Sequence, residues 1–92
     1  MSDLNKDLIF FYGNECSHCI KMEALLDQLE KEERITVCRL EVWNNKENEK
    51  KLEQCDKGKD PCGGVPFFIN TKTGCTICGE AEYEEIKEWA KK

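Results

Sequence analysis

The sequence predicts one α/β domain over residues 1–92, with elements in the order β-α-β-α-β-β-α. Short segments rich in β-branched and aromatic residues alternate with longer segments whose apolar residues recur at helical spacing. A strand-helix-strand unit needs a crossover, so the first two strands should be parallel, and a final hairpin should supply antiparallel edges. These observations predict a four-stranded mixed sheet with helices on both faces. A chain of 92 residues is too short for two separate cores.

The first half of the chain supplies a strand, a helix and a second strand. Residues 7–13 are apolar and aromatic, bounded by polar residues and glycine, and predict a fully buried strand. The polar residues 14–17 can start a helix, which should continue to about Glu32. Residues 35–43 alternate in a β-rich pattern that predicts a central strand. The expected core positions of the helix are Met22, Leu25, Leu26 and Leu29.

The second half begins with a polar helix at residues 46–57, in which Leu52 and Cys55 are the expected core contacts. Glycines and prolines dominate residues 58–64 and lead into a strand at residues 65–70. A turn at residues 71–74 returns the chain as an antiparallel strand at residues 75–78. An amphipathic helix should follow from Glu80. Its apolar stripe consists of Tyr83, Ile86, Trp89 and Ala90.

Composition excludes several classes of partner. The formal net charge of −5 disfavours nonspecific binding to nucleic acid or anionic lipid, since both attract basic surfaces. The longest apolar run, residues 8–12, is far below the roughly 20 residues that cross a bilayer. The first seven residues also lack the features of a secretory signal. We therefore expect a cytoplasmic protein without nucleic-acid or membrane partners.

The seven cysteines are the unusual feature of the composition. An odd number cannot be consumed entirely by internal disulfides. In a reducing cytosol, such a density favours redox catalysis or metal binding over a structural disulfide framework.

Cys16 and Cys19 form a Cys-x-x-Cys motif where the first strand ends and the first helix begins. Unpaired backbone N–H groups and the helix dipole favour the thiolate form of Cys16, which makes it the candidate nucleophile. Cys19, one turn further on, can resolve a mixed disulfide formed at Cys16. His18 can add partial positive charge or a hydrogen bond that stabilises Cys16. The same spacing is also half of a zinc site, and His18 alone could be an ordinary exposed histidine.

A second motif lies at Val65 and Pro66, which precede the predicted hairpin, and Gly79 follows that hairpin. Together with the strand, the Cys-x-x-Cys helix start and the element order, these residues resemble the thioredoxin-like superfamily, which includes thioredoxins, glutaredoxins and disulfide isomerase domains. The resemblance covers nearly the whole chain. It implies a thioredoxin-like fold and a redox pair at Cys16 and Cys19. It also implies that Val65–Pro66 is a cis-proline segment whose backbone binds an extended substrate, with Gly79 in the same groove.

The chain departs from the familiar subgroups at several positions. Ser17 and His18 stand between the cysteines, where thioredoxins usually have Gly-Pro and glutaredoxins Pro-Tyr. Trp43 lies at the end of the second predicted strand, whereas thioredoxins have a tryptophan just before the cysteine pair. Tyr12 and the residues up to Glu15 occupy that place and could form part of the substrate rim. Basic residues for holding glutathione are not evident, although Lys21 could contribute.

The other five cysteines leave several interpretations open. Cys38 reads as a small core residue, and Cys55 could pack beneath its helix. Cys55, Cys62, Cys75 and Cys78 could supply four thiolates to zinc, but strand alternation would put Cys75 and Cys78 on opposite faces. Cys62 and Cys78 flank the expected groove, so they could form a second disulfide or relay electrons from the main pair. Otherwise these residues are unpaired thiols.

The predicted function is that of a small thiol-disulfide oxidoreductase acting on disulfides of proteins or small thiols. The protein should need no bound cofactor or metal. We expect a reductase or glutathione to serve as its electron donor, and we expect it to be a monomer. The competing prediction is a cysteine-rich module that binds zinc or an iron-sulfur cluster, or another interaction partner, on the same scaffold.

Overall fold

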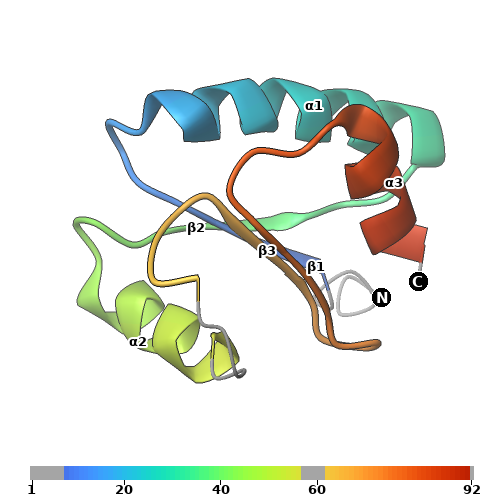
Figure 1. The fold of residues 1–92 in the computed structure, drawn as a ribbon. Helices are drawn as coiled ribbons and strands as arrows, with labels where there is room; N and C mark the ends of the chain where they lie inside the picture. The colour runs from blue at the N-terminus through green and yellow to red at the C-terminus, as the bar shows by residue number, and fades with distance from the viewer. Residues whose placement is uncertain (1–7, 57–61, 92) are drawn as a thin grey trace.

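The structure is a computed structural model that describes residues 8–56 and 62–91. Within these residues the elements follow the predicted order β-α-β-α-β-β-α (Figure 1). The strands are β1 (Leu8–Tyr12), β2 (Cys38–Glu41), β3 (Phe67–Asn70) and β4 (Cys75–Cys78), and the helices are α1 (Ser17–Glu33), α2 (Lys46–Cys55) and α3 (Tyr83–Lys91).

The four strands form one mixed sheet in the order β2-β1-β3-β4. β1 pairs with β2 in parallel, and the β1–β3 and β3–β4 pairs are antiparallel, as the α/β prediction requires. The prediction of a central second strand is wrong, because β2 lies at the edge of the sheet. All four residues of β2 are only half-buried, whereas all four of β3 are buried. Charged residues at alternate positions, Arg39 and Glu41, are compatible with a strand that pairs with a neighbour on one side only.

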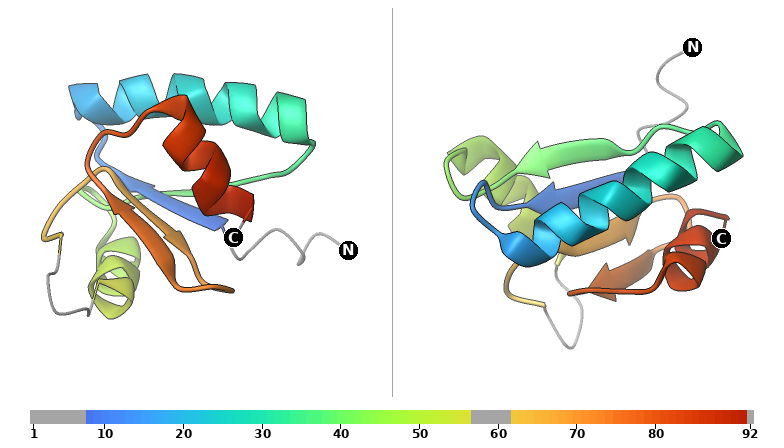
Figure 2. Two further views of the ribbon diagram at one scale, coloured as in Figure 1. Left: turned by 45° about the vertical axis from the view of Figure 1, so that its right-hand side comes forward. Right: turned by 90° about the horizontal axis from the view of Figure 1, so that it is seen from above.

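Helices cover both faces of the sheet, which confirms the predicted layers. Figures 1 and 2 show α1 and α3 on one face and α2 on the other. The fully buried Phe10 and Phe11 divide these faces between them, since successive strand side chains point in opposite directions. Phe10 packs in the cluster under α1 and α3, and Phe11 packs in the smaller cluster under α2. Rings continue the first cluster from Phe10 to Phe68 (centroids 4.8 Å apart) and on to Trp89 (5.3 Å, edge-on).

The helix α1 begins where the sequence predicts. Its buried residues recur every three or four positions, so a single stripe faces the sheet. Arg34, in the left-handed conformation with φ of 57°, ends the helix. Arg39 of β2 lies against the carboxylates of Asp27 (2.7 Å) and Glu30 (3.1 Å), which ties the edge strand to the helix. The buried stripe is Cys19, Met22, Leu26 and Leu29.

The helices α2 and α3 differ slightly from the predicted ranges. The side chain of Asn45 accepts a hydrogen bond from Asn48 N (3.1 Å) and caps α2, whose one buried residue is Leu52. The last residues of the predicted range of α2 include Lys57, which lies outside the described residues. The helix α3 starts at Tyr83, three residues after the predicted Glu80. Among the described residues, no helix has both the length and the apolar composition needed to cross a bilayer.

Candidate functional site

The loop after β1 places Cys16 at the N-cap of α1. Cys16 N donates to Gly13 O (3.2 Å), and Cys19 N donates to Cys16 Sγ (3.2 Å). A sulfur therefore occupies the position at which serine or aspartate oxygens usually cap a helix. Free N–H groups and the helix dipole at this end favour negative charge on that sulfur. Cys16 keeps 6% of its surface exposed, so it reaches solvent to a small extent.

Cys19 lies one turn behind Cys16 and is fully buried. Burial, followed by a side-chain hydrogen bond with Cys16, raises the pKa of Cys19 to about 12. Cys19 is therefore a protonated thiol at neutral pH, and both cysteines are free thiols in this structure. The pair consists of an outer sulfur at a helix terminus and an inner thiol held in the protein interior.

A shallow open groove of about 380 Å³ lies beside this helix start. Four residues singled out from the sequence line it, together with Glu80; they are His18, Val65, Pro66 and Gly79. Val65–Pro66 is a cis peptide, as the resemblance implies. Gly79 N donates to Pro66 O (2.8 Å), so the groove wall is formed by two hydrogen-bonded segments. Val65 also packs against the buried cluster that contains Cys16, which puts the groove next to the cysteine pair.

Tyr12 does not line this groove. Its ring is half-buried and stacks on Phe10, with centroids 6.0 Å apart and planes 9° from parallel. Tyr12 thus belongs to the packing beneath the site, although it stands at the end of the strand that leads to Cys16.

His18 contacts Glu80, a residue that the sequence reasoning did not select. His18 Nδ1 meets a carboxylate oxygen of Glu80 at the side of the groove. This contact is the main cause that lowers the pKa of Glu80. The structure gives His18 this partner, while the hydrogen bond at Cys16 Sγ comes from Cys19. The adjacency of Glu80 to the groove residue Gly79 was the one signal in the sequence that could have pointed to it.

Glu41 and Trp43, at the end of β2, hold the loop that leads to Cys16. One Glu41 carboxylate oxygen accepts from Asn14 N and from Trp43 N (both 2.9 Å), and the other accepts from Asn44 N (2.8 Å). The Trp43 ring lies directly over Gly13, where any β-carbon would overlap the ring. Because β1 and β2 are parallel, the sequence-distant Trp43 reaches the loop before the cysteine pair.

The remaining cysteines are arranged differently from a zinc site. Cys62 and Cys78 form a disulfide, with Cα atoms 5.5 Å apart, and Cys38, Cys55 and Cys75 are free thiols. The expectation that Cys75 and Cys78 occupy opposite faces of the strand is confirmed. Cys75 packs against the cluster under α1 and α3, whereas Cys78 lines a hollow on the α2 side. In the part of the chain that the structure describes, no three histidine, cysteine or acidic side chains are placed to hold a metal ion.

Comparison with known proteins adds no family to this picture. No protein-family model matches the chain, and no curated protein matches it. What the site does must therefore be inferred from its own chemistry.

Proposed function

We propose that the protein is a thiol-disulfide oxidoreductase of thioredoxin-like type, with Cys16 as nucleophile and Cys19 as resolving thiol. The observation that carries this proposal is the cap position of Cys16 Sγ, with the buried Cys19 thiol one turn behind it. A sulfur at a helix N-terminus is the one whose thiolate the backbone favours. Because burial keeps Cys19 protonated at neutral pH, we assign Cys19 to the second step, in which the mixed disulfide is resolved.

The proposed cycle uses two exchange reactions. The Cys16 thiolate attacks one sulfur of a substrate disulfide, the substrate S–S bond breaks, and one substrate sulfur leaves as a thiolate. Cys19 then attacks Cys16 Sγ, the bond between Cys16 and the substrate breaks, and the proton lost by Cys19 passes through solvent to the substrate thiolate that leaves. The products are a reduced substrate and a Cys16–Cys19 disulfide. A reductase or glutathione returns the two electrons to the pair, and the reverse cycle oxidises a dithiol.

The groove suits substrates that are extended peptide chains containing a disulfide, or disulfides formed by small thiols. The half-buried Val65 and the buried Pro66 both line the groove, and no atom lies within 4 Å of the β-carbon position of Gly79. A peptide can therefore approach Gly79 closely and lie along Val65, with its disulfide toward Cys16. The element order and the place of Val65–Pro66 beside the helix start support the thioredoxin-like assignment. A cytoplasmic location belongs to the same proposal, since that compartment supplies the reductants.

Substituting the two cysteines separately tests this division of labour. We expect Cys16→Ser to lower the rate of insulin disulfide reduction, with dithiothreitol as electron donor, to the rate with dithiothreitol alone. Cys19→Ser should instead accumulate a mixed disulfide between Cys16 and substrate, because the resolving thiol is missing. Nonreducing electrophoresis and peptide mass mapping detect that species.

Cys38→Ser is the matched control, because Cys38 is a half-buried free thiol on the edge strand and should keep full activity. Iodoacetamide at neutral pH should modify Cys16 and spare Cys19, whose pKa is about 12. Full activity in Cys16→Ser would refute the proposal. So would one tightly bound zinc or iron per chain in protein purified under reducing conditions, which would instead support a metal-binding module.

A further inference from the structure

Three cysteines from separate elements surround a second hollow, on the face of the sheet away from α1. Cys55 ends α2, Cys62 lies ahead of β3, and Cys78 ends β4. All three line a hollow of about 350 Å³, and Phe67 and Ile69 supply apolar walls. Two of these sulfurs are joined in the disulfide, and the third is a free thiol.

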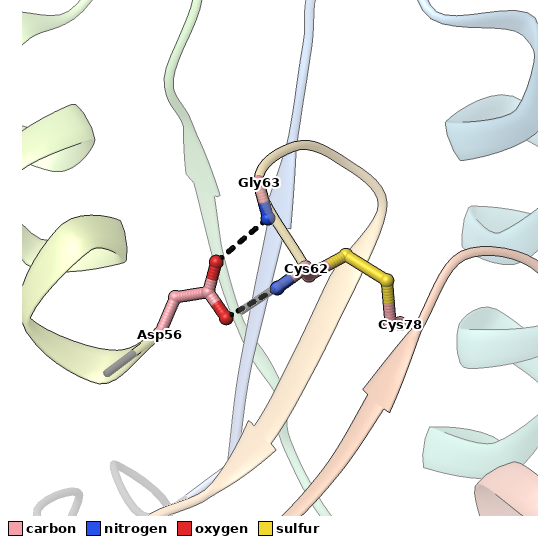
Figure 3. The surroundings of a disulfide bond; sticks show 4 residues. All are labelled: Asp56, Cys62, Gly63 and Cys78. Atoms are coloured by element: carbon pink, nitrogen blue, oxygen red, sulfur yellow. Dashed lines mark hydrogen bonds between the residues drawn. A yellow bond between two sulfur atoms is a disulfide. The ribbon is translucent and has the colours of Figure 1, made fainter. Parts of the chain in front are cut away.

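Short contacts hold Cys55 and Cys62 close together. Asp56, the neighbour of Cys55, accepts hydrogen bonds from Cys62 N and Gly63 N, each 2.8 Å long (Figure 3). Asp56 N in turn donates to Leu52 O (2.8 Å), which fixes the end of α2. Cys55 and Cys62 also pack against the same buried cluster under α2. Cys55 and Cys62 therefore line one hollow, with the chain on either side of it tied together through Asp56.

The two sulfurs of the disulfide differ in their surroundings. Cys62 is half-buried and packs with the cluster, whereas Cys78 is exposed at the end of the edge strand. A thiolate that leaves at the exposed Cys78 meets more water than one that leaves at the half-buried Cys62. Attack at Cys62 Sγ, with departure of Cys78, is therefore the favoured direction, because a better-solvated thiolate leaves more readily.

We infer that Cys55, Cys62 and Cys78 form a second thiol-disulfide exchange centre, distinct from the Cys16–Cys19 pair. Cys55 loses its proton to solvent and attacks Cys62 Sγ, a Cys55–Cys62 bond forms, the Cys62–Cys78 bond breaks, and the Cys78 thiolate takes up a proton. One S–S bond replaces another, so no oxidant or reductant is consumed. The exchange moves a reactive thiol from the half-buried Cys55 to the exposed Cys78, where disulfides of small molecules can react with it.

The position of Cys78 gives this exchange a consequence for the groove. Cys78 immediately precedes Gly79, and Cys62 lies three residues before Val65, so the disulfide links the two segments that line the groove. Burial raises the pKa of Cys55, so the Cys55 thiol attacks only after it has lost its proton, and the exchange is slow at neutral pH. Disulfides in reducing compartments are usually catalytic or redox-sensing, which agrees with an exchanging bond at this position.

Trapping the released thiol tests the inference on the full chain. Protein isolated without reductant is incubated with iodoacetamide, quenched in acid and mapped by mass spectrometry of its peptides. We expect alkylated Cys78 to accumulate together with a Cys55–Cys62 disulfide. In Cys55→Ser, alkylation of Cys78 should be at least tenfold slower, whereas Cys38→Ser should behave as the wild type. Equal Cys78 alkylation in Cys55→Ser and the wild type would overturn the inference.

Two further variants locate the attacking sulfur. Cys78→Ser, reduced and then oxidised with diamide, should contain the Cys55–Cys62 disulfide. Recovery of Cys62 as a free thiol, or joined to Cys75, contradicts the proposed geometry. Cys16→Ser should show unchanged alkylation of Cys78. Loss of alkylation there would identify Cys16 as the attacking thiol and overturn this centre, while leaving the proposed function of the first pair standing.

Discussion

Gly13 is the residue at which the loop before Cys16 meets the Trp43 ring. A β-carbon at Gly13 would overlap that ring, so Gly13→Ala must displace either the ring or the loop. We expect the free energy of unfolding to fall by about 1–3 kcal/mol, the usual cost of overpacking. The displaced Trp43 should also become more accessible to iodide. Urea unfolding and fluorescence quenching measure the two effects.

Gly64→Ala is the matched control for this substitution, because no atom lies within 4 Å of a β-carbon at Gly64. That variant should unfold at nearly the same urea concentration as the wild type. If Gly13→Ala matches it in stability and in quenching, Trp43 does not support the loop.

Single residues of the site were predictable only where local structure decides their place. Cys16 and Cys19 follow from a strand and a helix that meet within a few residues, so the outer and inner positions could be expected from spacing alone. The contact between His18 and Glu80 joins residues 62 apart in the sequence. Trp43 over Gly13 is a similar case. Such contacts depend on how the strands are ordered, which periodicity does not reveal.

At the scale of elements, a hydrogen bond between side chains joins α3 to α1. Tyr83, the first residue of α3, donates its hydroxyl to Glu32 of α1 (2.5 Å). This bond raises the pKa of Tyr83 to about 12 and lowers the pKa of Glu32. A raised tyrosine pKa contributes stability that is complete below the unfolded value of about 10 and is lost as the pH approaches 12. The lowered pKa of Glu32 contributes stability above its unfolded value, which acidification removes.

Tyr83→Phe should therefore flatten the loss of stability between about pH 10 and about pH 12. Urea unfolding at several pH values measures that slope, and phenolate absorbance should lose its last-titrating component. Glu32→Gln removes the charged acceptor and should have the same effect on the slope. A double variant that loses more than either single variant would show that the two side chains act separately.

The elements themselves were largely predictable, and their ends less so. The predicted strand at residues 35–43 is confirmed only at Cys38–Glu41. Val37 N donates to the Glu30 carboxylate (2.8 Å) instead of extending the ladder. The edge position of β2 could not be read from its alternation, since half-buried strands at the edge and at the centre of a sheet share that pattern. The helix α3 begins after Glu82, whose N–H donates to the Glu85 carboxylate (3.1 Å) and whose carbonyl accepts from Ile86 N (3.1 Å).

At the scale of the whole molecule, the Cys62–Cys78 disulfide closes a loop across a small domain. The two residues are 16 apart in sequence. Cross-links of this length stabilise a fold by about 3 kcal/mol, chiefly by restricting the unfolded chain. We expect the double variant Cys62→Ser/Cys78→Ser to lose about 2–4 kcal/mol in the free energy of unfolding. Urea unfolding without reductant measures this loss.

Dithiothreitol supplies the control for that measurement. It should destabilise the wild type by a similar amount and leave the double variant almost unchanged. A wild type whose stability is insensitive to dithiothreitol would contradict a cross-link that contributes to the fold.

The overall architecture followed from the sequence because each element carries a strong pattern of its own. The pairing of the cysteines did not follow. Seven cysteines allow many pairings, and their spacing left zinc, a disulfide and free thiols all open at Cys62 and Cys78. Only the three-dimensional arrangement, in which Phe67 of β3 lies opposite Cys78 of β4, brings these two residues together.

The carboxylate of Glu41 joins the loop after β1 to the loop after β2. It accepts hydrogen bonds from Asn14 N, in the loop that leads to Cys16, and from Asn44 N, in the loop that leads to α2. Neither loop can move independently without breaking a hydrogen bond to the Glu41 carboxylate. The loop before the outer sulfur and the loop that enters α2 thus share one acceptor, so a substitution at Glu41 would disturb both loops together.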